Sequence, residues 1–291
     1  MRHLRALPAL LLALTLSLAL TACGAAPDAA ASGSRNLPDI SGANTLPQTL
    51  ALPPVELPPL RLTLVDGAGT DTLLLAGETA GEVYTVPTEA LPLTLDGEPA
   101  DPSVLEDGMP LTVCYTGIEE SFPARLGITA VEAYSLGTAG NPGGGFYDLC
   151  GLYLKVLSDL ASGGKETVAV DLSQAPGGLT EGEKAAVAWR FRELCGTGLA
   201  DPESAAPGTA LFTIRAAAGA EGELCSLPTR EEGEVYSLPV LRFDAERSRI
   251  PAVPDTGLPA EARILRDCFA VWPEFGTWSG YRVGEEILAC G

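Results

Sequence analysis

The stretch Gly108-Met109-Pro110-Leu111-Thr112-Val113-Cys114-Tyr115-Thr116-Gly117, followed by Glu120-Ser121-Phe122-Pro123-Ala124, is typical of two strands joined by a turn. In its first half, Leu111, Val113 and Tyr115 alternate with other residues up to Gly117. Successive side chains of a strand point to opposite faces, so this period of two predicts a strand with one buried face. A second strand is predicted over 124–134.

The same pattern extends toward the N-terminus. Leucines at every second position from residue 60 alternate with Arg61 and Thr63 and end before Asp66-Gly67. Further short segments that end at turn residues are 72–75, 82–86 and 91–95. Five or six short strands at this spacing predict a small closed or sandwich-like β-domain over 59–136.

The first strand with glycine at its end, the Glu120-Ser121-Phe122-Pro123 turn and the following strand together resemble a known family. They are similar to the YobA-like, OB-like β-barrel domain of unknown function, which occurs in secreted and lipid-anchored bacterial proteins. The resemblance covers residues 60–135 and implies an OB-like barrel in an exported protein. Because the family has no assigned chemistry, the resemblance implies no activity.

The first 23 residues have the order of an export signal. Arg2 and Arg5 precede an apolar run over 6–20 that is short for a permanent membrane helix. Leu20-Thr21-Ala22-Cys23 resembles the lipobox of bacterial lipoproteins, in which the cysteine sulfur carries diacylglycerol and becomes the first mature residue. This implies a lipoprotein signal peptide over 1–22 and a chain anchored through Cys23 to the extracytoplasmic side of the cell membrane. The alternative is an ordinary secretory peptide cleaved near Ala22.

Residues 23–58 are rich in Ala, Ser, Gly, Pro and Asn and have almost no apolar period, which predicts a flexible tether. The mature chain is also strongly acidic. Residues 1–22 hold two of the 18 basic residues and no acidic ones, so the other 269 residues carry 16 basic and 38 acidic side chains, a formal charge of −22. Such a surface repels phosphate backbones and anionic headgroups. Nucleic acid is therefore not an expected partner, and the lipid is the expected membrane anchor.

The single histidine, His3, lies in the predicted signal peptide. A mature chain without histidine cannot use a Ser-His-Asp or Cys-His mechanism, and it lacks the commonest zinc and copper ligand. The Asp-Gly turns at Asp66, Asp96 and Asp107 do not have the spacing of a calcium-binding loop. We therefore expect no cofactor, no metal site and no catalytic residue set.

The pattern changes after residue 136. The glycine-rich segment 137–145 predicts a linker and a domain boundary. Over 146–291 the expected elements are helices over 146–157 and 181–195 and strands over 167–172, 210–216, 235–243, 262–272 and 277–288. The second helix begins with a capping box, Thr180-Glu181-Gly182-Glu183. We expect an α+β domain in which two helices cover one face of an antiparallel or mixed sheet.

Six cysteines follow Cys23: Cys114, Cys150, Cys195, Cys225, Cys268 and Cys290. An exported chain permits disulfides, and six cysteines allow 15 pairings. Their spacing is wide and irregular, and the chain has no C-x-x-C motif. Buried free thiols, with one or two bridges in the C-terminal half at most, are the favoured interpretation, and the pairing stays open.

Aromatic residues gather near the C-terminus, where ligand-binding candidates are Trp272, Glu274, Phe275, Trp278 and Tyr281. On an exposed turn, such rings provide contact area for a sugar face or a peptide. The alternative is that the tryptophans cover the core at the end of a hairpin, because aromatic side chains are mostly buried.

These observations favour a non-enzymatic lipoprotein that binds a protein or glycan of the cell envelope. The alternative is a carboxylate-dependent envelope glycan hydrolase, which needs two carboxyl groups about 5 Å or about 6.5 to 9.5 Å apart. Two facing carboxylates in a deep cleft would favour the enzyme. An apolar patch or an exposed strand edge would favour a binding partner.

Overall fold

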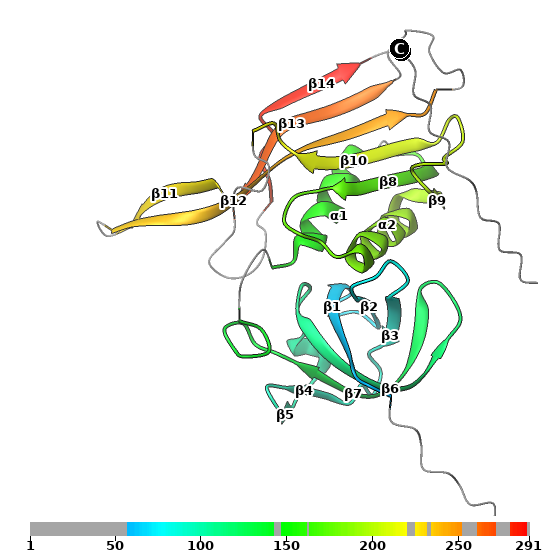
Figure 1. Cartoon of the computed structure of the whole chain (residues 1–291), viewed down its shortest axis with the longest axis vertical. Coiled ribbons are helices and arrows are strands. Elements are labelled where there is room, and N and C mark those ends of the chain that lie inside the picture. Colours follow the sequence, from blue (N-terminus) through cyan, green and yellow to red (C-terminus); the bar gives the residue numbers. More distant parts are fainter. Residues whose placement is uncertain are drawn as a thin grey trace, which may run out of the picture. The chain divides into compact units, whose positions relative to one another are not determined.

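The computed structural model describes residues 57–142, 147–161, 163–219, 225–231, 234–251, 261–271 and 280–289 (Figure 1). The predicted signal peptide, Cys23 and the predicted tether up to residue 56 lie outside these ranges. So does 143–146, so the predicted linker and the domain boundary stay predictions.

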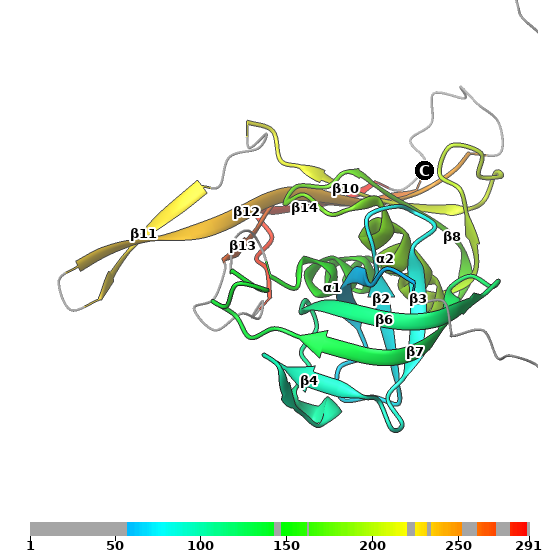
Figure 2. The same ribbon diagram turned by 60° about the horizontal axis from the view of Figure 1, so that its bottom comes forward.

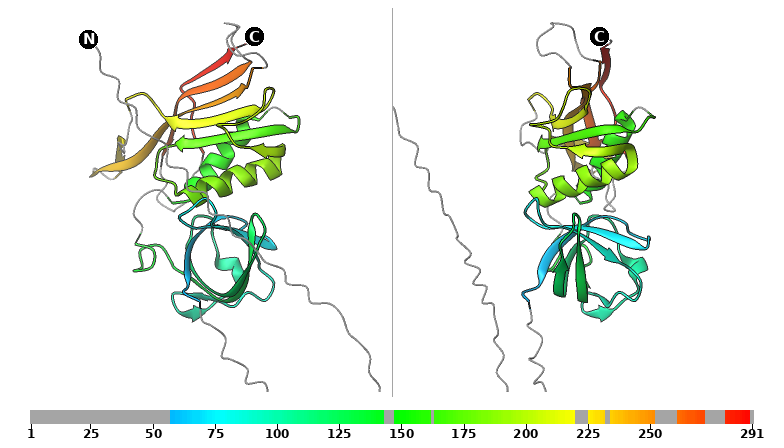
Figure 3. Two further views of the ribbon diagram at one scale, coloured as in Figure 1. Left: turned by 45° about the vertical axis from the view of Figure 1, so that its right-hand side comes forward. Right: turned by 90° about the vertical axis from the view of Figure 1, so that its right-hand side faces the viewer.

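The N-terminal part is a closed β-barrel of five strands (Figure 3). The strands are β1 (Leu60–Asp66), β2 (Thr72–Ala76), β3 (Val83–Pro87), β6 (Pro110–Glu119) and β7 (Ala124–Ala133). Neighbouring strands in the order β3-β2-β1-β6-β7 are antiparallel, and a parallel pairing of Tyr84 with Ala124 closes β3 against β7. The predicted closed β-domain is confirmed, and its mixed five-stranded architecture is consistent with an OB-like barrel.

Small elements fill the connection between β3 and β6. The strands β4 (Leu93–Leu95) and β5 (Glu98–Pro99) form a hairpin, in which β4 pairs in parallel with β7. A single 3-10 turn, η1 (Pro102–Val104), follows and is capped by the Asp101 side chain, which accepts a hydrogen bond from Ser103 N–H. Strand β4 pairs with the end of β7, on the edge where β3 pairs with the start of β7, and Leu93 of β4 belongs to the apolar cluster of the barrel interior.

Apolar side chains at every second position of the strands fill the barrel interior. The apolar side chains buried there form one cluster, which includes Leu62, Leu64, Leu73, Leu75, Tyr84, Val86, Leu111, Val113 and Val131. The residues between them on β1 and β6 point outward, as the alternation predicted.

Strands β1 to β3 depart from simple alternation because their outer faces are buried too. Val65, Leu74, Ala76 and Val83 belong to a second apolar cluster, together with buried residues of the two helices and of the second sheet. The continuous run Leu73-Leu74-Leu75-Ala76 therefore has one pair of side chains inside the barrel and the other pair under the helices. Continuous apolar runs are typical of strands that are covered on both faces.

The C-terminal part is a mixed sheet with two helices (Figure 1). Its strand order is β14-β13-β12-β10-β8-β9, with β11 paired to β12. Strand β8 is parallel to β9 and β10, and the other pairs are antiparallel. The bounds are α1 (Leu149–Leu160), β8 (Glu166–Gln174), α2 (Glu181–Cys195), β9 (Gly196–Ala200), β10 (Ala210–Ala216), β11 (Cys225–Glu231), β12 (Glu234–Arg249), β13 (Ala262–Val271) and β14 (Glu285–Ala289).

Two of these strands were not predicted. Strand β9 starts at Gly196, directly after the last residue of α2. Strand β11 pairs with the first half of β12, and this ribbon extends beyond the rest of the sheet (Figure 2). Neither α1 nor α2 has the length and apolar character needed to cross a membrane.

Aromatic side chains connect the helices to the sheet. Tyr153 of α1 meets Phe243 of β12 edge to face at 6.1 Å, and Phe191 of α2 meets Phe212 of β10 at 4.7 Å. All four rings belong to the second apolar cluster, and each is fully buried. Such pairs stabilise a core beyond the area that they bury.

Four of the six cysteines have described side chains, and all four are free thiols: Cys114, Cys150, Cys195 and Cys268. Cys150 and Cys268 are buried, and burial raises the pKa of both thiols, that of Cys268 to about 12. The side chains of Cys225 and Cys290 lie outside the described residues, so their pairing stays a prediction.

The N-terminus of α2 lies directly on the turn between β2 and β3. The predicted capping box is present: Glu183 N–H donates to the Thr180 hydroxyl, and Thr180 N–H donates to the Glu183 carboxylate. The Thr180 hydroxyl also donates to the Gly77 carbonyl at 2.7 Å, and Gly182 N–H donates to the Glu78 carbonyl at 3.4 Å. The free donors of a helix N-terminus are thus satisfied partly by the barrel.

Replacing Gly182 by Ala tests this contact. A methyl group at Gly182 would lie 2.9 Å from both the Gly77 carbonyl carbon and the Thr79 carbonyl oxygen, which are backbone atoms that cannot rotate away. Helix propensity favours Ala by about 1 kcal/mol, but we expect the clash to prevail and to lower the free energy of unfolding by about 1 to 3 kcal/mol. Urea denaturation measures the change.

Gly198→Ala is the control for that variant. A methyl group there would meet nothing closer than a Thr167 side-chain atom at 3.7 Å. We expect the control to change stability by less than about 0.5 kcal/mol. A stabilised Gly182→Ala variant would show that α2 does not lie against the β2–β3 turn.

Candidate functional site

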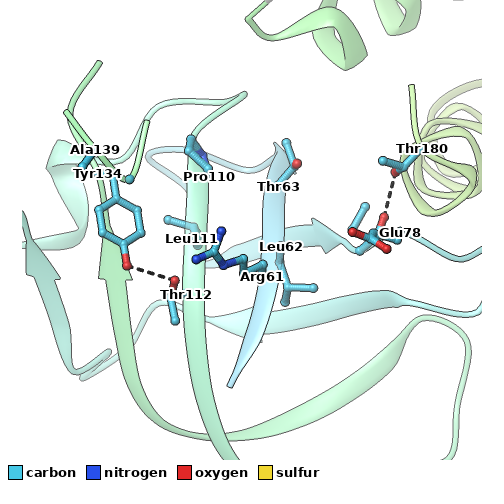
Figure 4. A pocket seen from close by; sticks show the side chains of 13 residues that line it. Arg61, Leu62, Thr63, Glu78, Pro110, Leu111, Thr112, Tyr134, Ala139 and Thr180 are labelled. Atoms are coloured by element: carbon cyan, nitrogen blue, oxygen red, sulfur yellow. Dashed lines mark hydrogen bonds between the residues drawn. The ribbon is translucent and has the colours of Figure 1, made fainter. Parts of the chain in front are cut away.

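A polar groove lies on the outer face of the barrel (Figure 4). Its cavity volume is about 260 Å³. The polar side chains that line it are Arg61, Thr63, Glu78, Thr112, Tyr134 and Thr180. We call this site the barrel groove.

Strand register brings the first of these residues together. Arg61 of β1 is paired with Thr112 of β6, and Thr112 is paired with Glu132 of β7. These residues alternate with core leucines and valines, so their side chains share the outer face. The row Arg61, Thr112, Glu132 therefore crosses three adjacent strands.

Tyr134 forms one wall of the barrel groove. Its hydroxyl donates to Glu132 Oε2 at 2.7 Å and lies 3.0 Å from Thr112 Oγ1. A side chain at Gly140 would overlap the Tyr134 ring, so glycine allows the 135–141 loop to lie against it. Asn141, which is buried, holds the loop by donating its side-chain N–H to the Tyr134 carbonyl at 3.1 Å.

The environment of the Tyr134 hydroxyl combines opposing effects. The hydrogen bond with Thr112 lowers the pKa of Tyr134, but partial burial and the hydrogen bond and charge of Glu132 outweigh it. The pKa therefore lies above its usual value, although the positive charge of Arg61 opposes the shift. Tyr134 stays a neutral hydrogen-bonding group at physiological pH.

Arg61 is the cationic group of the barrel groove. Its side chain is exposed, and in the part of the chain that the structure describes it forms no ion pair. Figure 4 shows its guanidinium group directed toward Thr112 and Tyr134. In a strongly acidic chain, an arginine that has no partner is available for an external group.

The opposite side of the groove is formed by the β2–β3 turn and the start of α2 (Figure 4). The Thr180 hydroxyl is already used by Gly77 and Glu183. The Glu78 carboxylate is exposed, and it makes no hydrogen bond or ion pair with any described residue. The groove thus has an unpaired cation and an unpaired carboxylate in its lining.

Three other carboxylates interact at the junction between the barrel and α1. Asp148 caps α1 from a left-handed backbone conformation (φ 49°), and its side chain accepts a hydrogen bond from Gly151 N–H at 3.0 Å. Asp107 accepts one from Ala68 N–H at 2.9 Å, and Asp66 pairs with Arg190 at 2.6 Å. Among the described residues no group of three His, Cys, Asp or Glu side chains has the arrangement of a metal site.

Asp148 is the most perturbed of the three. Burial raises its pKa to about 7, although the Gly151 hydrogen bond opposes the shift, and the charges of Asp107 and Asp66 raise it further. Burial also raises the pKa of Asp107. Asp148 is therefore partly protonated near neutral pH, while its side chain serves as a helix cap.

The pH dependence of stability tests this assignment. Because the pKa of Asp148 is about 7 in the folded protein and 3.8 for an ordinary aspartate, the folded protein binds more protons than the unfolded chain between these pH values. Its stability should fall as pH rises from about 4 to about 7 and then stay level. Asp148→Asn keeps a capping oxygen and tolerates the left-handed conformation. It should remove this fall and raise the free energy of unfolding at pH 8 by about 2 kcal/mol.

Asp101→Asn is the control for the pH experiment. The Ser103 backbone N–H donates to the Asp101 carboxylate and lowers the pKa of Asp101. The contribution of Asp101 to stability is therefore lost as pH falls. The control should therefore keep the loss of stability between pH 4 and 7. Denaturation curves at several pH values measure both variants, and equal pH profiles for Asp148→Asn and the wild type would contradict the assignment.

The predicted aromatic site is only partly described. Trp272, Glu274, Phe275 and Trp278 lie outside the described residues, so their role in binding stays a prediction. Tyr281 packs against the core that the helices and second sheet share, with its ring 5.8 Å from that of Phe243. Its hydroxyl donates to Asp159 at 3.1 Å. Tyr281 thus contacts the core with its ring and forms a hydrogen bond at the surface with its hydroxyl, and its role in ligand binding stays a prediction.

Sequence reasoning did not identify the barrel groove. Alternation predicted that Arg61 and Thr63 face outward, but it could not show which residues of other strands lie beside them. Gly140, which lies in the predicted linker 137–145, lines the groove against Tyr134. The register between β1, β6 and β7 was the missing information.

Comparisons with protein-family models, with curated proteins and with solved structures found no match. A function for this chain is therefore proposed from its own residues and their geometry.

Proposed function

We propose that the protein is an exported lipoprotein that binds a component of the cell envelope without transforming it. In this proposal Cys23 carries the lipid, 23–58 form the tether, and 59–136 form a YobA-like barrel. An α+β domain over 146–291 follows, with its two helices on one face of the sheet. The order of charge, apolar run and lipobox in 1–23 supports export, and the closed barrel supports the family resemblance.

The unpaired guanidinium of Arg61 in the barrel groove is the observation that carries the binding function. Most described arginines form ion pairs, which use their charge within the protein. Arg61 instead lies beside two hydroxyl groups on a concave surface. Convergent polar groups in a concavity are typical of ligand sites.

The barrel also gives a reason not to propose nucleic acid as the ligand. OB-folds bind oligonucleotides on the face of their second and third strands. In this chain Leu74, Ala76 and Val83 on that face are buried in the cluster that contains α2. This face is covered, and the mature chain is expected to carry a charge of −22. Both facts favour a partner other than nucleic acid, bound on a surface other than the face of β2 and β3.

The glycan hydrolase stays a second candidate because of Asp148. A carboxyl group with a pKa of about 7 near two others is the arrangement from which a general acid can be built. However, Asp148 caps α1, and it does not line the barrel groove. Hydrolysis of any envelope glycan that is lost in Asp148→Asn would favour the enzyme over the binding protein.

The lipid anchor is tested at Cys23. Mass spectrometry of the mature N-terminal peptide should identify Cys23 as the first residue, modified by diacylglycerol. Cys23→Ser removes the acceptor sulfur and should abolish lipid attachment, whereas Cys114→Ser should not. An unmodified N-terminus that begins at another residue would contradict the proposal.

The groove is tested by filling it. Thr63→Phe places a large ring on the outer face of β1, and a strand accommodates an aromatic residue well. We expect it to reduce binding to membrane-free cell-wall material by about tenfold or more, measured by sedimentation of the purified full chain in detergent. Thr116→Phe, at an exposed position of β6 outside the groove, is the matched control. Equal binding by both variants would exclude the barrel groove as the contact.

A further inference from the structure

The hydrogen-bonding groups of the barrel groove have a mixed character. Arg61 offers only donors, and Glu78 offers only acceptors. Thr63 and Thr112 hydroxyls both donate and accept, and Tyr134 adds a ring beside them. A ligand that satisfies this lining must itself carry donors and acceptors close together, next to a surface that can contact a ring.

The charges of the groove limit the class of ligand. The formal charges of Arg61 and Glu78 cancel, and Glu132 adds a negative charge where it accepts a hydrogen bond from the Tyr134 hydroxyl. An anionic ligand would therefore meet no net positive field, and the acidic surface of the protein would repel it at longer range. A cationic ligand would be attracted by Glu78, Glu132 and the acidic surface, but beside Thr112 and Tyr134 its charge would be repelled by the guanidinium of Arg61. A neutral ligand pays neither electrostatic penalty.

We propose that the barrel groove binds one unit of a neutral saccharide. Each sugar hydroxyl both donates and accepts a hydrogen bond, so hydroxyls on one side of the sugar can bind Arg61 and Thr112, and a hydroxyl on the other side can donate to Glu78. The apolar face of the sugar ring would pack beside the Tyr134 ring, which lines the groove. This inference rests on the proposed binding function and names its ligand class.

The dimensions agree with a single unit. The cavity of about 260 Å³ is near the lower limit of ordinary ligand sites, which fits a single ring better than a chain of rings. The walls are also held in place: Tyr134 is fixed by Glu132, Thr112 and the 135–141 loop, and Thr180 is fixed by Gly77. A preformed polar wall lowers the entropic cost of binding a small ligand.

The experiment is an NMR titration of the purified full chain with glucose, galactose, mannose and N-acetylglucosamine as neutral probes. We expect at least one to shift the backbone amide signals of Arg61, Thr63 and Thr112. Arg61→Gln and Glu78→Gln should each weaken that binding about tenfold, the effect of losing a hydrogen bond to a charged group. Arg125→Gln is the matched control, because Arg125 is exposed on β7, lines no part of the groove, and should leave the affinity unchanged.

Glucuronate and N-acetylalanine distinguish a carboxylate site from a saccharide site. If the groove recognises neutral sugars, neither should bind more tightly than the best neutral probe. Tenfold tighter binding of either one overturns the inference, as does the absence of binding by every neutral probe. Because Thr63→Phe tests wall binding separately, the saccharide inference can fail while the groove keeps its proposed function.

Discussion

The hydroxyl of Thr180 connects the two parts of the described chain. It accepts from Glu183 N–H within α2 and donates to the Gly77 carbonyl in the barrel, so one oxygen caps the helix and fixes it to the β2–β3 turn. Gly182 allows the close approach. Around this contact α2 lies over β1 to β3, and the outer apolar residues of these strands join the core of the helices and second sheet. Gly77 and Thr180, which make this contact, also line one side of the barrel groove. The packing of α2 on the barrel and the shape of the candidate site therefore both involve this contact.

Much of the fold could be predicted from local patterns. The capping box located α2 from Glu181 to Cys195, and alternation located the barrel strands, because both signals depend only on neighbouring residues. Strand β9 was missed since it follows Cys195 without a loop, and its sequence Gly-Thr-Gly-Leu-Ala has few strand-forming residues. Leu73-Leu74-Leu75-Ala76 was interpreted as an ordinary strand, although its continuous apolar character indicated burial on both faces.

The candidate site was beyond local patterns. The barrel groove combines residues from 61 to 180, and which of them meet depends on strand register and on the position of α2. The aromatic cluster attracted a prediction because its residues are close in sequence. Tyr281, its described member, packs against the core, and the predicted role of the cluster in ligand binding stays a prediction. A charged side chain without an ion-pair partner in a concave surface is a better indicator of a ligand site, but it can be recognised only in the three-dimensional structure.

The long separation between Gly77 and Thr180 affects how this chain matures. These residues are 103 positions apart, so during synthesis the strands β1 to β3 emerge well before the helix that covers them. Until α2 follows, the barrel exposes Leu74, Ala76 and Val83 to solvent. An unfinished chain therefore exposes an apolar surface on an otherwise complete barrel, and whether it aggregates depends on how quickly the remaining residues are added and α2 folds over that surface.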